Sequence, residues 1–128
     1  MYSETGRSSE QPNRPRPVRA LLRPLHYIII WEFHVRPGSE TQFEQAYGPD
    51  GDWVRLFQQD KGYIQTELLR DEKNQGRYLT VDHWASRTAY ERFREQRVGD
   101  YERLDGDCAH LTEREIHLGS YEGVSRPR

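Results

Sequence analysis

Cysteine is nearly absent from this chain of 128 residues: only Cys108 occurs, which excludes an internal disulfide framework. A lone thiol fits a reducing compartment, so we expect a cytoplasmic protein. Long hydrophobic runs are absent as well. The longest, from Tyr27 to Trp31, has only the length of a strand, and we expect no membrane-spanning helix and no membrane partner. The run Ala20-Leu21-Leu22 is too short for the apolar core of a signal peptide.

Motifs that bind common cofactors are also missing. The chain has no glycine-rich phosphate loop, no dinucleotide fingerprint and no Gly-x-Ser-x-Gly nucleophile motif. The five histidines lack a compact ligand spacing, so we expect no metal and no cofactor. Residues 25–122 carry twelve Lys or Arg and nineteen Asp or Glu residues, and this acidic balance argues against nucleic acid as a partner.

The length suits one domain with a modest core. Residues 1–24 are rich in proline and arginine with little to bury, and we expect a disordered arm. Residues 25–122 are expected to form the domain, and residues 123–128 a loose tail. The low hydrophobic share of 34% is in part a property of these two ends.

The hydrophobic pattern predicts six main elements in the order βαββαβ. Strands are expected at residues 26–35, 63–70, 77–84 and about 112–121, with the second and third forming a hairpin. A helix is expected after Ser39, followed by a short one at about 52–58. Another helix is expected to start after the N-cap Ser86 and to end at Asp105-Gly106-Asp107. This order predicts an α+β ferredoxin-like fold: a four-stranded antiparallel sheet with helices on one face.

The first strand has two unlike faces. The side with Tyr27, Ile29, Trp31, Phe33 and Val35 is wholly apolar and is expected to face the helices. The side with Ile28, Ile30, Glu32 and His34 is mixed, and we expect it to border a cavity. The sheet face without helices would expose apolar side chains, which predicts a homodimer packed sheet to sheet. The alternative is that the N-terminal segment covers this face.

Three runs resemble the antibiotic biosynthesis monooxygenase family. They are WEFHVRPGSE at residues 31–40 with Phe43 and Tyr47-Gly48 after it, GYIQTELLR at 62–70, and DHWAS at 82–86. The resemblance implies a dimeric α+β barrel. Its superfamily includes cofactor-independent quinone-forming oxygenases, heme-degrading oxygenases, isomerases and members with no known activity.

The heme-degrading branch of that superfamily can be tested on the sequence. Members of that branch use an Asn on the first strand, a Trp at the end of the third strand and a His on the following helix, so a resemblance to them would imply these three residues. Trp84 matches the Trp, but the first strand has no Asn and the helix that starts at Ser86 has no His. Heme degradation is therefore disfavoured.

The leading hypothesis is a cofactor-independent monooxygenase that acts on a small aromatic or polyketide-like substrate. His34 is the candidate general base, oriented by Glu32 or Asp82, and the remaining carbanion would react with oxygen. The candidate substrate-binding walls are Trp84, Trp31 and Tyr63. Alternation puts Asp82 and Trp84 on one side of the third strand and His83 on the other, and leaves open which side faces the cavity.

Two other functions fit the same pattern. One is a non-enzymatic, dimeric ligand-binding or stress-associated module, and the other is an isomerase or cyclase that needs the base but not oxygen. The residues also have structural alternatives: His34 as a hydrogen-bonded strand residue, Asp82 as an ion-pair or helix-capping partner, and Trp84 as core. Convergence of Glu32, His34 and Asp82 on one cavity would favour the enzyme. Saturation of each by arginine or backbone would favour the module.

Overall fold

The computed structural model describes residues 26–124. The arm expected at residues 1–24, and residues 125–128 of the expected tail, lie outside these described residues. The elements in chain order are β1 (Tyr27–Val35), α2 (Glu40–Tyr47), α3 (Asp52–Phe57), β2 (Tyr63–Arg70), β3 (Arg77–Trp84), α4 (Arg87–Gln96), α5 (Val98–Cys108), the 3₁₀ turn η1 (Ala109–Leu111) and β4 (Thr112–Glu122).

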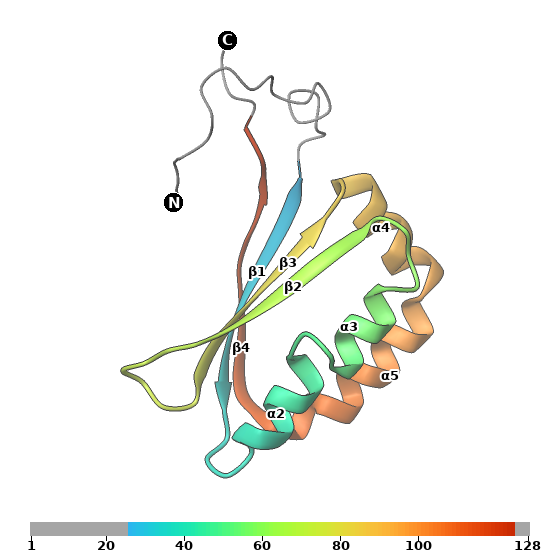
Figure 1. Ribbon diagram of the computed structural model, residues 1–128. Coiled ribbons are helices and arrows are strands. Elements are labelled where there is room, and N and C mark those ends of the chain that lie inside the picture. The colour runs from blue at the N-terminus through green and yellow to red at the C-terminus, as the bar shows by residue number, and fades with distance from the viewer. Residues whose placement is uncertain (1–25, 125–128) are drawn as a thin grey trace.

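The four strands form one antiparallel sheet in the order β2-β3-β1-β4. The helices of residues 26–124 all lie on one face of this sheet, and no helix of this range lies on the other face (Figure 1). This arrangement confirms the α+β ferredoxin-like fold that the order of elements predicts.

The hydrophobic core lies between the sheet and the helices. Ile29, Phe33 and Val35 of β1 are buried there, as the wholly apolar side of this strand predicts. Phe43 of α2 and Phe93 of α4 meet them from the helix layer, and neither has any exposed surface. Burying a side chain of this size stabilises the fold by about 1.5–3 kcal/mol, so this face fixes how the helices dock.

The register of the sheet decides which face each polar strand residue occupies. Asp82 lies opposite Ile29 on β1 and opposite Thr66 on β2. Because directly opposed residues of antiparallel strands point to the same side, Asp82 faces the helices. His83 lies opposite Ile28 and therefore faces away from them.

The helical region after β3 differs from the expectation. Ser86 caps α4 as predicted, since its hydroxyl accepts a hydrogen bond of 3.0 Å from the Ala89 N–H. The helix is interrupted at Arg97, whose φ of −121° and ψ of 28° leave the helical region, and α5 then continues through residues 105–107. The predicted end there is wrong because the packing of α5 on the core outweighs the poor helix propensity of Gly106. No helix within residues 26–124 combines the length and apolar character needed to cross a membrane.

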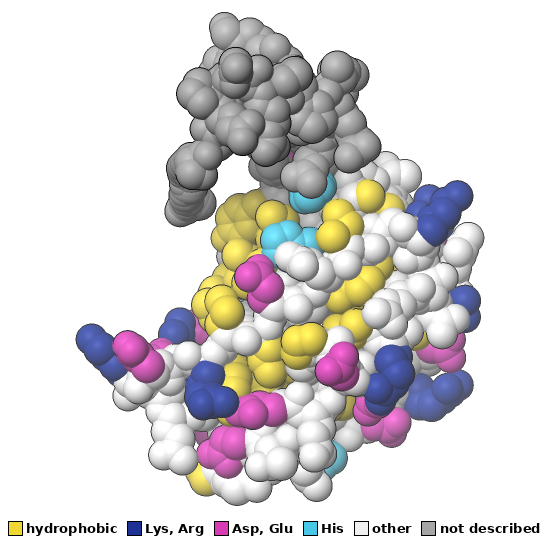
Figure 2. Space-filling view, viewed as in Figure 1, with side chains coloured by type: hydrophobic (Ala, Val, Ile, Leu, Met, Phe, Trp, Pro, Cys, Tyr) yellow, Lys and Arg dark blue, Asp and Glu magenta, His cyan; other side chains and the backbone are white. Residues whose placement is uncertain are grey.

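The sheet face without helices, here called the open face, carries both apolar and charged side chains. Its centre is apolar, and Val81 lies opposite Ile30 there, with both side chains half-buried. Leu69 on the neighbouring strand is exposed. Figure 2 views the molecule from the side, with the sheet on the left and the helices on the right, and shows hydrophobic side chains across the middle of this surface with most of the charged groups toward its periphery.

Candidate functional site

A cavity of about 280 Å³ lies between the sheet and the helices. All four strands and all four α-helices contribute to its lining. The residues are Trp31, Phe33, Tyr47, Trp53, Phe57, Thr66, Thr80, Asp82, Arg94, Tyr101, Asp105 and Glu115. Six of them are aromatic, so the walls favour a flat apolar ligand, and the few polar groups are available to orient it.

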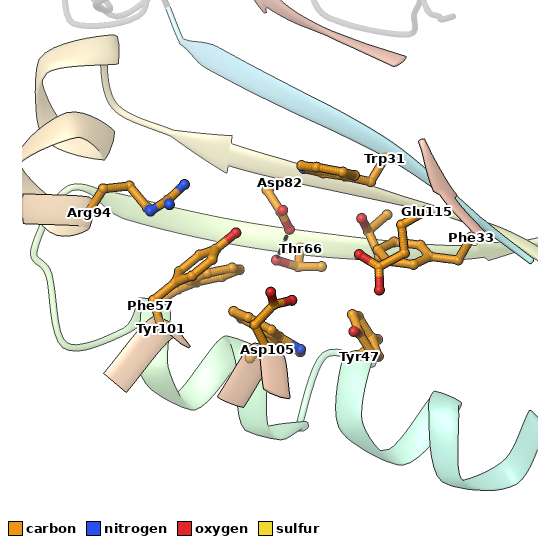
Figure 3. Close-up of a pocket in the computed structure, with 12 residues that line it drawn as sticks. Trp31, Phe33, Tyr47, Phe57, Thr66, Asp82, Arg94, Tyr101, Asp105 and Glu115 are labelled. Carbon is orange, nitrogen blue, oxygen red and sulfur yellow. Dashed lines mark hydrogen bonds between the residues drawn. The ribbon is translucent and has the colours of Figure 1, made fainter. Parts of the chain in front are cut away.

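Asp82 is the most buried carboxylate of this cavity, with 8% of its surface exposed. Its Oδ1 accepts a hydrogen bond of 2.7 Å from the Thr66 hydroxyl, and Thr66 in turn accepts one of 2.8 Å from the Tyr63 hydroxyl. Figure 3 shows the Asp82 carboxylate directed toward Thr66 inside the cavity. Within residues 26–124, Asp82 forms no ion pair and caps no helix, so neither structural alternative describes it.

Burial raises the pKa of Asp82 to about 6, although the Thr66 hydrogen bond opposes this shift. A carboxylate with a pKa near neutrality is a better proton acceptor than an ordinary surface aspartate, and it remains mostly ionised at pH 7. The chemistry that this geometry supports is removal of a proton from a ligand held between the aromatic walls.

Three other charged side chains line the same cavity as this carboxylate. Figure 3 shows the Arg94 guanidinium extending from α4 toward Asp82. Asp105 and Glu115 lie on the exposed part of the lining. Burial raises the pKa of the Glu115 carboxyl, the Thr112 hydroxyl opposes the shift with a hydrogen bond of 3.1 Å, and the negative charge of Asp105 adds to it. Within the described chain, no three His, Cys, Asp or Glu side chains come together to hold a metal ion.

Glu32 and His34 do not share this cavity. They lie on the open face, opposite Leu79 and Arg77 of β3, so the expectation that the mixed side of β1 borders the cavity is wrong. The Glu32 carboxylate pairs with His34 Nε2 at 2.6 Å and with Arg77 Nε at 3.1 Å. The Arg77 guanidinium, followed by His34, holds the pKa of Glu32 below its usual range. The three proposed catalytic residues therefore do not converge, because strict alternation sends Glu32 and His34 away from Asp82.

The three expected wall residues have different positions. Trp31 lines the cavity as expected. Trp84 does not: it has no exposed surface and packs in the core against Phe57 and Phe93, at centroid distances of 5.5 and 5.1 Å. Tyr63 is also outside the lining, but its hydroxyl reaches Asp82 through Thr66.

Arg94 and Thr66 line the cavity but were not among the residues expected there from the sequence. Arg94 lies four residues after Tyr90 and seven before Tyr101, so it shares their side of the helical region. Thr66 occupies the same side of β2 as Leu68, which is the helix-facing side. A polar residue within an apolar face was the signal for both positions.

Comparisons with known proteins agree with this fold. The family model described as antibiotic biosynthesis monooxygenase matches residues 26–97, more than half of the chain. Among curated proteins, none matches. The solved structure of a mutant of SnoaB, a cofactor-independent oxygenase from Streptomyces nogalater, has a TM-score of 0.61 and 16% identity over 80% of this chain and 95% of that one.

Two further solved structures are similar to a comparable degree. A proposed antibiotic biosynthesis monooxygenase from Bordetella bronchiseptica has a TM-score of 0.64 and 20% identity, with coverage of 77% of this chain and 97% of that one. Rv0793 from Mycobacterium tuberculosis has a TM-score of 0.57 and 14% identity, with coverage of 80% and 97%. At these identities the structural similarity establishes the fold alone.

Proposed function

This chain belongs to the antibiotic biosynthesis monooxygenase family, and from that premise we propose that it is a cofactor-independent monooxygenase acting on a small aromatic or polyketide-like substrate. The substrate would occupy the cavity between the sheet and the helices, and Asp82 would be the general base. The observation that carries this proposal is a buried, unpaired carboxylate inside an aromatic cavity.

The chemistry begins with the breaking of an activated ring C–H bond. The proton passes to the Asp82 carboxylate, and the electron pair is delocalised over the ring and its oxygen substituent. Molecular oxygen is the oxidant. It adds to the ring carbon, one oxygen atom is retained as a carbonyl, and the other leaves as water with the two hydrogens of the original CH₂ group.

The aromatic lining supports this step in two ways. Phe33 and Tyr47, whose ring centroids are 4.9 Å apart and whose planes are tilted by 56°, form a packed apolar wall against which an aromatic ligand can lie. The same apolar surroundings raise the pKa of Asp82. The aromatic lining therefore both positions the ligand and makes the Asp82 carboxylate a stronger proton acceptor.

The decisive experiment is oxygen consumption by the full chain with a panel of anthrones and quinols, comparing the wild type with Asp82→Asn. Asparagine keeps the size of the side chain but cannot accept the proton, so we expect a loss of kcat of about 10²- to 10⁴-fold. Asp107→Asn is the matched control, because Asp107 is exposed on α5 and does not line the cavity. An inactive wild type across the panel, or a fully active Asp82→Asn variant, would contradict the proposal.

A specific observation also favours the non-enzymatic alternative. Two of the three predicted catalytic side chains, Glu32 and His34, are paired with each other on the open face, and Glu32 is saturated by Arg77. A dimeric ligand-binding module would need only the cavity. Tight binding of the same aromatic compounds without any oxygen consumption would favour this second function.

A further inference from the structure

Arg94 is a cavity residue that the proposed reaction has not yet used. Its Nη1 donates a hydrogen bond of 2.9 Å to the Tyr90 hydroxyl, and its guanidinium carbon lies 3.9 Å from the centroid of the Tyr101 ring. Both tyrosines are half-buried against the core. Two aromatic side chains therefore hold the guanidinium in one orientation on the cavity wall.

The positive charge of Arg94 has no counter-ion within residues 26–124. Most other arginines in this part of the chain pair with carboxylates, as Arg77 does with Glu32 and Arg92 with Asp60. Arg94 forms no such pair, although three carboxylates line the same cavity. Its Nε is enclosed and has no hydrogen-bond acceptor, and its Nη2 donates to no residue in the described range. A preorganised cation with spare donors is suited to binding an anion.

We propose that Arg94 is a second catalytic residue, which binds the substrate oxygen that gains negative charge when Asp82 removes the proton. The inference rests on the proposed function. The C–H bond breaks, the proton goes to the Asp82 carboxylate, and the electron pair is delocalised onto the ring oxygen, where the Arg94 guanidinium stabilises the charge. The substrate class is thus narrowed to flat aromatic compounds that carry an ionisable ring oxygen.

The carboxylates of the lining raise the competing possibility of a cationic ligand. Asp105 and Glu115 are both exposed, and Glu115 accepts a hydrogen bond from Thr112. Water and salt screen the charge of Asp105, and the Asp82 and Glu115 carboxylates already accept hydrogen bonds from Thr66 and Thr112, so the three groups attract a cation weakly. Arg94 is half-buried and stacked on an aromatic ring, so its charge is less screened at the cavity wall. The geometry favours the anion.

Binding of three unreactive probes to the full chain tests this assignment by calorimetry. The probes are 2-naphthoate, 2-naphthylmethanol and protonated 2-naphthylmethylamine, which share one flat ring system and differ in charge. We expect the wild type to bind 2-naphthoate about 10- to 100-fold more tightly than the alcohol, the range of a charge-assisted hydrogen bond. Arg94→Gln should abolish this preference while leaving affinity for the alcohol within about threefold, and Arg94→Lys should retain part of it.

The control variant is Arg87→Gln, because Arg87 lies on the same helix, is exposed, and pairs with Glu91 outside the cavity. It should leave all three affinities unchanged. Tightest binding of the amine, a carboxylate preference that survives in Arg94→Gln, or no binding of any probe by a wild type that consumes oxygen would overturn the assignment. If the protein consumed no oxygen but still bound 2-naphthoate more tightly than the alcohol in an Arg94-dependent way, the anion site would be supported and the proposed reaction would be contradicted.

Discussion

The two faces of the sheet differ in whether their ionisable side chains form ion pairs. On the open face, the Glu32 carboxylate contacts His34 Nε2 at 2.6 Å and forms an ion pair with Arg77 at 3.1 Å. On the helix-covered face, Asp82 and Arg94 line one cavity without forming an ion pair. Keeping a buried carboxylate and a half-buried guanidinium apart costs stability, and such an arrangement is typical of sites that act on a ligand. The candidate catalytic residues therefore lie on β3 and α4 and not on β1.

The pKa values of Glu32 and Asp82 are shifted in opposite directions. Ion pairing lowers the pKa of Glu32 on the open face. Burial raises the pKa of Asp82 on the covered face to about 6. The first carboxylate therefore stabilises the fold when it is ionised, whereas the second destabilises it.

The largest expected effect concerns the open face, which we propose as the dimer interface. Val81→Lys places a charge at its apolar centre, opposite Ile30. Burying an unpaired ammonium between two sheets is costly, so the dimer dissociation constant should rise by at least about 100-fold. Sedimentation over a range of concentrations measures this. Val98→Lys, on the exposed surface of α5, is the control and should leave the dimer intact. A wild type that stays monomeric at high concentration would remove the proposed interface.

The next effect is on stability. Unfolding releases the Asp82 carboxyl to its ordinary pKa of 3.8, so the folded state binds this proton more tightly and stability falls as pH rises from about 4 to about 6. Asp82→Asn removes that penalty, and at pH 8 it should be more stable than the wild type by about 2–3 kcal/mol, a difference that disappears below pH 4. Urea unfolding at several pH values measures this difference.

Glu32→Gln should show the reverse sign in the same unfolding experiment. The folded state lowers the pKa of Glu32, so its ionised form stabilises the protein above the ordinary pKa of 4.5, and this contribution is lost as pH falls through the lowered value. The variant should therefore be less stable than the wild type at pH 7, with a smaller difference in acid. If Asp82→Asn and Glu32→Gln changed the free energy of unfolding in the same direction at neutral pH, the proposed difference between the two faces would be wrong.

A smaller effect is expected from Thr66→Val, which keeps the shape of the side chain but removes the hydroxyl. The Thr66 hydrogen bond lowers the pKa of Asp82, so its loss should raise that pKa and move the acid limb of the pH–activity profile upward, by less than about one pH unit. Oxygen consumption between pH 4 and pH 9 measures this limb. A limb that stays in place would mean that Asp82 does not control it.

The smallest effect is expected from His34→Gln. His34 lies on the open face and contacts Glu32, away from the cavity. Oxygen consumption should change by less than about twofold if the base is on the other face. A loss as large as that of Asp82→Asn would return the catalytic role to His34.

Much of the fold was predictable because local patterns and global packing agree. The hairpin strands at 63–70 and 77–84 have the expected bounds, and Ser86 caps its helix as expected. The end expected at residues 105–107 was wrong because α5 packs Tyr101 and Cys108 against the core, a long-range effect that a local Asp-Gly-Asp pattern does not contain.

The sequence by itself determined the order of the elements, and through strict alternation it determined which residues of each strand share a face. It also identified the apolar side of β1 that the helices cover. Only the tertiary structure decided that this covered side, and not the mixed one, encloses the cavity. The reason is that side chains alternate along a strand with a period of two, so the sequence shows which residues of one strand share a face. Whether Asp82 on β3 and Arg94 on α4 line the same cavity depends instead on how the helix docks across the sheet.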